Sequence, residues 1–461
     1  MTNKKSSSEL SYIILITVIA ALGGTLFGYD QGVISGALNF FSVHFHLNQT
    51  TVGFVSGVLA LGAMGGCLLA GFLTDHLGRK KVMLLAGCLF TLSSLVLAIS
   101  QSVEILILGR ILSGIAIGMA STVVPLYISE VAPAKIRGTL VSANQLAFAI
   151  GMTTVFIVNA IIANTHALAW NVALGWRFMF GSGMVPAIIF FVLSFVIPES
   201  PRFLIKVGKA KEAEAVLIRL NGEETAKKEA LQIEDSIKSE KKGLISELFA
   251  PGVRFAFLIA ILAAVFQQLT GTIAVGYYAP AIFKMTGVGT NASLIETIGI
   301  GVIKIIFVAI FMLYIDKLGR KKLLRNGALA MVVALLLLSI LFSIGKFNMV
   351  IDVLILIGVL AHTAAYELSW GGGAWVIVSE VFPTSIRGRA LSFSSMAMFL
   401  TSYFVTQFFP IMLSKLGAPV TFGVFAVFCI IMAIFAAKML PETTGKSLEE
   451  IEAYFKEKST H

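Results

Sequence analysis

The sequence predicts an all-α membrane protein with twelve transmembrane helices in two related six-helix bundles, and three observations lead to this fold class. The 461 residues are 57% hydrophobic and only 13% charged, with a mean hydropathy of +0.90. A polytopic membrane protein needs this much apolar sequence because its lipid-facing side chains are apolar too. Apolar runs of transmembrane length recur along the chain. The polar segment GFLTDHLGRKK at 71–81 returns in part as DKLGRKK at 316–322, which indicates a duplicated chain.

Twelve apolar segments are long enough to cross a bilayer, for which an α-helix needs about 20 residues. They lie at about 11–36, 51–74, 82–100, 104–126, 139–163, 177–197, 254–280, 292–315, 323–344, 350–378, 390–413 and 419–438. A hydrophilic stretch after the sixth segment predicts short amphipathic helices. The expected organisation is an N-terminal bundle at 1–198, a cytoplasmic helical linker at 199–250, a C-terminal bundle at 251–440 and a cytoplasmic tail at 441–461.

Further motifs repeat after corresponding helices of the two halves. The segment SEVAP at 129–133, followed by IRG at 136–138, returns as SEVFP at 379–383 and IRG at 386–388. PES at 198–200 returns as PET at 441–443. Such a repeat predicts two bundles related by an axis along the membrane normal, with a substrate bound between them near the midplane.

The distribution of lysine and arginine predicts the orientation. With the N-terminus inside, the inner short connections carry the cations of 79–81, 135–137, 317–325 and 387–389. The outer ones hold only Arg177, Lys284, Lys346 and Lys415. Cytoplasmic loops are enriched in such cations, so both termini are expected in the cytoplasm of a multi-pass plasma-membrane protein. Because the cations behind the net charge of +10 gather in loops, the expected partner is the lipid bilayer, with neither nucleic acid nor an obligate protein.

Other function classes lack their sequence signatures. No GxxxxGK[ST] segment occurs in the sequence, which argues against ATP as the energy source. Cys67, Cys88 and Cys429 lie in apolar runs without metal-ligand spacing, as buried hydrophobic cysteines do. Neither a metal cluster nor a nucleophile constellation is present, so we expect neither an enzyme nor a bound cofactor.

Charges inside the apolar segments are expected to be functional, because an ionisable side chain within a bilayer is costly. Asp30 lies in the first segment, and its expected partner is Arg110 in the fourth; a static buried pair is the alternative. Lys304 lies in the eighth segment, roughly 17 Å from either interface at about 1.5 Å per residue, too deep for its side chain to reach water. It is expected to face Glu367, Glu296 as a weaker partner, or a carboxylated substrate.

The motifs together carry a family resemblance. In order they are FGYD at 27–30, the loop at 71–81, Gly109-Arg110, the two Glu…Arg-Gly loops, PESPR at 198–202, Gln267-Gln268 with Tyr277-Tyr278, and PET at 441–443. Over nearly its whole length the chain resembles the sugar porters of the major facilitator superfamily, such as bacterial xylose–proton and glucose–proton symporters and animal facilitative glucose transporters. The resemblance implies import of a monosaccharide (hexose or pentose) or related polyol by alternating access, with a proton as coupling ion and no other cofactor.

The resemblance also implies roles for particular residues. Asp30 and Arg110 would couple the proton, since proton-coupled members have aspartate at this place. Amides would bond sugar hydroxyls and aromatic rings would line the site; the substrate-binding candidates are Phe27, Gln145, Gln267, Gln268, Tyr277, Lys304, Trp370 and Trp375. Cytoplasmic gating ion pairs would involve Asp75, Arg79, Glu130 and Arg137 in one half and Asp316, Arg320, Glu380 and Arg387 in the other. Instead of binding sugar, the glutamines could form polar contacts between helices. Instead of gating, the loop charges could serve only to fix the topology of the chain in the membrane.

The chain departs from the family pattern at several of these places. Ile273 stands where relatives have asparagine, and Met152 and Met398 stand where amides are usual. Lys304 replaces an asparagine that binds sugar in relatives. Several hydroxyl partners are therefore missing. The alternative functions are a proton-coupled importer of sugar acids that uses Lys304, an uncoupled facilitator, and a transporter-like sensor that signals without net transport.

Overall fold

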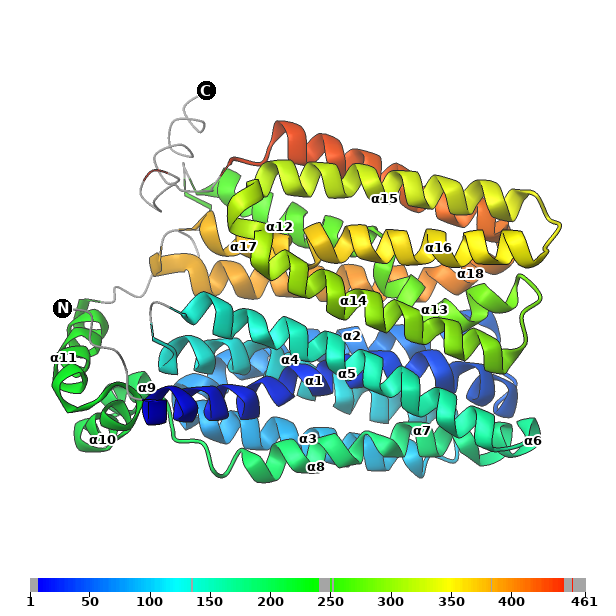
Figure 1. Cartoon of the computed structure of the whole chain (residues 1–461). Helices are drawn as coiled ribbons and strands as arrows, with labels where there is room; N and C mark the ends of the chain where they lie inside the picture. The colour runs from blue at the N-terminus through cyan, green and yellow to red at the C-terminus, as the bar shows by residue number, and fades with distance from the viewer. Residues whose placement is uncertain are drawn as a thin grey trace.

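The computed structural model describes residues 7–133, 136–239, 249–250, 253–382, 384–442 and 450. Within these ranges the chain is almost entirely helical and forms no β-strand. Figure 1 shows long helices side by side, with the N-terminal half below and the C-terminal half above. A group of short helices projects from one end of the molecule (Figure 1).

The N-terminal half contains five long helices and a broken sixth. They are α1 (Ser7–His44), α2 (Gln49–Leu77), α3 (Arg79–Ala98), α4 (Val103–Val131) and α5 (Arg137–Thr165), followed by α6 (Leu168–Trp170), the π-helical turn η1 (Asn171–Gly175), α7 (Trp176–Ser182) and α8 (Met184–Leu193). The projecting helices α9 (Pro201–Lys206), α10 (Ala210–Asn221) and α11 (Glu223–Ser239) lie within the segment predicted as a linker.

The C-terminal half repeats this plan with more interruptions. Its helices are α12 (Arg254–Leu269), α13 (Thr272–Lys284), α14 (Thr290–Leu318), α15 (Arg320–Ser343), α16 (Met349–Tyr366), the π-helical turn η3 (Glu367–Gly371), α17 (Gly372–Glu380) and α18 (Thr384–Lys438). Gly271, at a positive φ of 79°, separates α12 from α13. Gly417, at 77°, divides α18 into two crossings.

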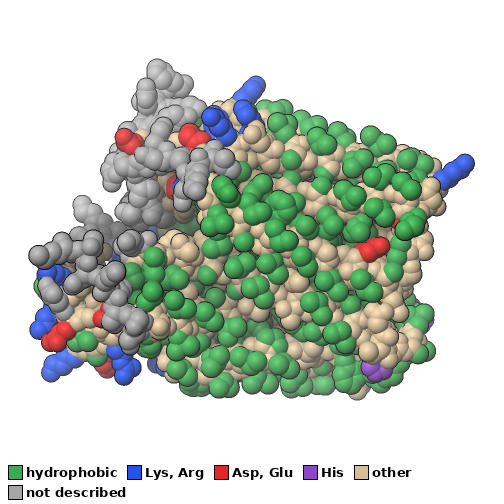
Figure 2. Space-filling view, in the orientation of Figure 1, with side chains coloured by type: hydrophobic (Ala, Val, Ile, Leu, Met, Phe, Trp, Pro, Cys, Tyr) green, Lys and Arg blue, Asp and Glu red, His purple; other side chains and the backbone are tan. Residues whose placement is uncertain are grey.

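The number of crossings agrees with the prediction. In the described residues, 11 helical stretches are long and apolar enough to cross a membrane, and the last, Gly388–Lys438, contains both crossings of α18. The twelve-helix prediction is therefore confirmed. Hydrophobic side chains cover the flank of the molecule, whereas most charged side chains in this view gather toward its ends (Figure 2).

A carboxylate caps corresponding helices in the two halves, which gives the PES and PET motifs a structural role. Glu199 accepts the backbone N–H of Arg79 at 2.8 Å, where α3 begins. Glu442 accepts the backbone N–H of Arg320 at 2.9 Å, where α15 begins. Negative charge is stabilising at a helix N-terminus, where backbone N–H groups lack partners. The repeated glutamates therefore fix the turns between α2 and α3 and between α14 and α15.

The two halves meet along close helix contacts. A Cβ atom on Gly53 of α2 would lie 2.2 Å from the carbonyl oxygen of Gln407 on α18. A Cβ atom on Gly301 of α14 would lie 2.6 Å from the hydroxyl of Thr153 on α5. Only glycine permits such approaches, so these positions set how closely the bundles pack.

Candidate functional site

The structure brings Asp30 of α1 and Arg110 of α4 together in the interior. Arg110 is fully buried, and its Nη1 lies 3.5 Å from Asp30 Oδ2. The hydroxyl of Ser113 donates to Asp30 Oδ1 at 3.1 Å. Arg110 Nη2 donates to the carbonyl of Ser56 on α2 at 3.4 Å. The pair is thus a small buried network that joins three helices of the N-terminal half.

This network borders the C-terminal half. Tyr277 on α13 is almost fully buried and interacts electrostatically with both Arg110 and Asp30. The neighbouring Tyr278 donates its hydroxyl hydrogen to the carbonyl of Thr406 on α18 at 3.0 Å. A change of charge at Asp30 would therefore change the electrostatic environment of α13, a helix of the other bundle.

The paired amides of α12 are used differently from the sequence-based expectation. Gln267 Nε2 donates to two backbone carbonyls of η3, those of Trp370 at 3.1 Å and Gly371 at 2.9 Å. Gln268 Nε2 points to Gln267 Oε1 at 3.5 Å. The amino group of Gln267, expected to meet sugar hydroxyls, is thus occupied by protein, and Gln268 is the partly free member of the pair.

Some of the expected aromatic residues come together between the bundles. Phe27 of α1 packs edge-on against Phe148 of α5, with ring centroids 5.0 Å apart, and lies 6.5 Å from Phe399 of α18. Trp375 packs against the buried apolar cluster that contains Phe399. Trp370 does not join them, because its buried indole donates to the carbonyl of Leu324 on α15 at 2.8 Å. Gln145 lies on α5 and is half-buried.

Lys304 meets Glu367 rather than Glu296. Its Nζ forms an ion pair with Glu367 Oε1, and only 5% of Lys304 and 2% of Glu367 are exposed. The ammonium also lies 5.7 Å from the ring centroid of Tyr366. Glu296 instead lies near a like charge, the carboxylate of Asp352 on α16. The charge of Lys304 is therefore balanced within the C-terminal half.

The charged loops form ion pairs within each half. Arg79 binds Glu130 through two parallel bonds, Nε to Oε2 at 2.9 Å and Nη2 to Oε1 at 2.7 Å. The copy in the other half joins Arg320 Nη2 to Glu380 Oε1 at 3.2 Å. Asp75 pairs with Lys206 of α9 at 2.8 Å. Three further gating candidates have side chains outside the described residues: Arg137, Asp316 and Arg387.

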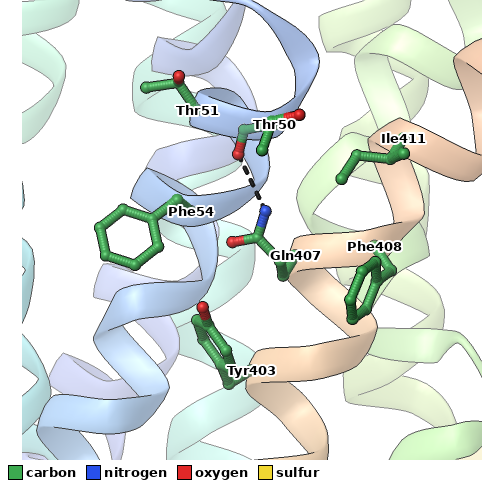
Figure 3. A pocket seen from close by; sticks show the side chains of 7 residues that line it. All are labelled: Thr50, Thr51, Phe54, Tyr403, Gln407, Phe408 and Ile411. Carbon is green, nitrogen blue, oxygen red and sulfur yellow. Dashed lines mark hydrogen bonds between the residues drawn. The ribbon is translucent and has the colours of Figure 1, made fainter.

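A groove lies between α2 and α18 (Figure 3). Gln407 of α18 spans it and donates to the carbonyl of Thr50 on α2 at 2.9 Å (Figure 3). The groove is lined by Thr50, Thr51, Phe54, Tyr403, Gln407, Phe408 and Ile411. This hydrogen bond and the close contact at Gly53 hold α2 of one bundle against α18 of the other.

Two functional features were not expected from the sequence. The capping role of Glu199 and Glu442 was missed, although their recurrence in PES and PET was the available signal. The attachment of Gln267 to η3 had no sequence signal, because a π-helical turn shows no periodicity of its own.

Comparisons with known proteins agree with this architecture. The family described as "Sugar (and other) transporter" matches residues 16–455. The arabinose-proton symporter of Bacillus subtilis (strain 168) is 41% identical over 446 residues, which cover 97% of this chain and 96% of the relative. The xylose transporter XylE from E. coli, solved in a partially occluded inward-open conformation, matches with a TM-score of 0.85 and 33% identity over 95% of this chain and 100% of that chain.

A second structure of XylE, described as a major facilitator superfamily proton:xylose symporter bound to 6-bromo-6-deoxy-D-glucose, gives a TM-score of 0.81 at 33% identity. It covers 97% of this chain and 100% of that chain. The resemblance inferred from the motifs is thereby confirmed. This chain belongs to the Sugar (and other) transporter family, has the major facilitator fold, and is a membrane transporter rather than an enzyme.

Proposed function

We propose that this protein imports a monosaccharide, a hexose or pentose, or a related polyol, together with a proton, by alternating access across the cell membrane. The similar chains are named for this chemistry, as an arabinose-proton symporter and a proton:xylose symporter. The observation that carries proton coupling to this chain is the buried pair of Asp30 and Arg110 beside the C-terminal bundle. With the cation-rich loops inside, both termini and α9–α11 lie in the cytoplasm.

Asp30 is the proposed proton site. While it is ionised, it holds Arg110, which also donates to backbone carbonyls of Asp30 and Ser56. Protonation removes the negative partner, and the guanidinium is then left with these carbonyls and Tyr277 of the other bundle. Because charge interactions are strong in a low-dielectric interior, proton occupancy changes the relative stability of the two bundle arrangements.

The sugar is proposed to bind between the bundles near the midplane, as in other transporters built from parallel repeats. Phe27 and Trp375 supply apolar faces for the C–H side of a sugar ring. Gln145 and Gln268 supply amides for its hydroxyls, since an amide both donates and accepts. Gln267 supports Gln268 instead of binding the sugar directly, because its amino group binds η3.

Alternation is proposed to depend on the loop ion pairs. Arg79–Glu130 and Arg320–Glu380 join helices within one half each. Pairs that are made in one arrangement and weakened in the other bias the equilibrium between them. Asp75, Arg137, Asp316 and Arg387 are the other charges assigned to this cytoplasmic gate.

A neutral substrate suits the described geometry better than a sugar acid. Lys304 is already neutralised by Glu367, and both side chains are buried. A substrate carboxylate that took Lys304 would leave Glu367 as an unpaired buried charge, which costs about 3–5 kcal/mol.

The test is external pH in a lightly buffered, de-energised suspension of cells expressing the protein. Neutral pentoses, hexoses, inositols and sugar acids are added one at a time. Alkalinisation with a neutral sugar is the expected result and identifies the substrate class. Alkalinisation with sugar acids alone would assign Lys304 to anion binding instead, and uptake of label without a pH change would make the protein a facilitator.

The role of Asp30 is tested by Asp30→Asn. This variant should lose accumulation of the sugar against a gradient while keeping exchange of labelled for unlabelled sugar. Glu104→Gln is the matched control, because Glu104 is an exposed carboxyl on the same helix as Arg110. Undiminished uphill uptake in Asp30→Asn would refute proton coupling through this residue.

A further inference from the structure

The π-helical turn η3 is held by a buried ion pair on one side. Glu367 is its first residue and pairs with Lys304 of α14. The same carboxylate reaches the far end of the turn, since a Cβ atom on Gly371 would lie 2.7 Å from Glu367 Oε2. One side chain therefore covers both ends of η3 and is itself fixed by Lys304.

The other side of the turn is held by the amide pair of α12. The amino group of Gln267 donates to the carbonyls of Trp370 and Gly371, the last two residues of η3. The remaining oxygen of Gln267 faces the amino group of Gln268. A continuous series of contacts thus runs from Lys304 through Glu367 and η3 to Gln268, the amide proposed to bind the sugar.

The turn is an unusual element that several helices hold in place. A π-helical turn is rare, and such turns occur frequently at functional sites. Trp370 within it is tied to α15 through the Leu324 carbonyl. Because η3 contacts α12, α14 and α15, loss of one contact can change where its carbonyls point, and the orientation of Gln267 changes with them.

We propose that Lys304 and Glu367 are positioning residues for substrate recognition: their ion pair fixes η3, and η3 sets, through Gln267, the direction in which Gln268 meets the substrate. This inference rests on the proposed function and deepens it. It makes a charge pair outside the proton site a determinant of sugar affinity. Neither side chain touches the substrate, so the pair acts on binding and leaves turnover unchanged.

The decisive variant is the double substitution Lys304→Met/Glu367→Leu, which removes both charges and so leaves neither unpaired in the interior. For the sugar identified by the pH assay, we expect the apparent KM to rise about tenfold, the equivalent of one weakened polar contact, with Vmax unchanged. Lys304→Arg, which retains the pair, should keep the KM of the unsubstituted protein. Glu296→Gln, on the same helix but outside the pair, is the matched control.

An unchanged KM in the double variant, or a loss of Vmax alone, would overturn the inference and leave the pair with a packing role. If the double variant does not reach the membrane, Glu367→Asp decides the matter. It keeps the charge but withdraws the carboxylate from Gly371, so KM should still rise, and an unchanged KM would overturn the inference.

Hydrogen exchange supplies a readout independent of transport. In Glu367→Asp, backbone amides of 367–373 should exchange faster than in the unsubstituted protein, while those of α4 stay the same. Equal protection of this segment would overturn the inference even if every sugar tested is refused. Refusal of all sugars by the unsubstituted protein would instead overturn the proposed function alone.

Discussion

The interface of α2 with α4 and the interface of α14 with η3 occupy corresponding places in the two halves, but they are built from different chemistry. When Asp75 is aligned with Asp316 in the repeated loop, Ala63 corresponds to Lys304. In the N-terminal half, the carbonyl of Ala63 would lie 2.1 Å from a Cβ atom on Gly118. In the C-terminal half, Lys304 extends to Glu367 instead.

The difference indicates how the two bundles divide their tasks. Glycine contacts between α2 and α4 bring backbone against backbone, and close-packed interfaces of small residues hold helices together in membranes. A Cβ on Gly299 of α14, by contrast, would meet only Leu360 of α16, at 3.7 Å. The N-terminal interface is therefore built on backbone contacts at glycines, whereas the C-terminal interface combines a buried charge pair, a π-helical turn and the ring of Phe311 packed against Gly372.

The largest expected effect follows from breaking the charge pair on one side only. Glu367→Gln leaves Lys304 without its negative partner in the membrane interior and should destabilise the protein by about 3–5 kcal/mol. Thermal unfolding of the purified protein in detergent measures this. Glu296→Gln serves as the control, and a melting temperature for Glu367→Gln equal to the control would show that the pair does not stabilise this interface.

A smaller effect is expected from adding one methyl group to each interface. Gly118→Ala places a carbon 2.1 Å from a backbone oxygen, so the helices must separate at a cost of about 1–3 kcal/mol. Gly299→Ala should be neutral, because its nearest neighbour is at ordinary contact distance. The two variants are compared by thermal unfolding, and equal losses would remove the contrast between a tight and a loose interface.

The loop ion pairs extend the same comparison to the end of the molecule that carries α9–α11. Arg79–Glu130 is bidentate, with both side chains 7% exposed, whereas Arg320–Glu380 has side chains 11% and 24% exposed. Lysine cannot form the two parallel bonds of arginine. Arg79→Lys should therefore cost about 1 kcal/mol relative to the unsubstituted protein, since hydrogen bonds to charged groups contribute more when shielded. A melting temperature equal to that of the unsubstituted protein would contradict this.

The smallest effect is expected at Lys206→Gln. Lys206 and Asp75 form an exposed pair, with side chains 43% and 57% accessible. Exposed ion pairs contribute about 0–1 kcal/mol and are screened by salt. The melting temperature should be unchanged at high ionic strength, and a shift that persists there would give this contact a larger role than exposure allows.

The pairing of Asp30 with Arg110 and of Lys304 with Glu367 could be anticipated, because a charge inside a bilayer demands a partner and few are available. The roles expected for Gln267 and Trp370 were less predictable. Their side chains follow the rotation of α12 and η3, and the structure directs them to carbonyls of η3 and α15 instead of into the space between the bundles. The resemblance to other transporters gave their positions, but not these contacts.

The twelve crossings, the duplication and the gathering of cations in particular loops can be read from the sequence, because each depends on local composition measured against a bilayer of fixed thickness. Three-dimensional packing was needed to show that the amino group of Gln267 and the indole of Trp370 are both occupied by backbone carbonyls. The cause is helical phase. A π-helical turn rotates every side chain after it, and hydrophobic periodicity along a nearly uniformly apolar helix does not record that rotation.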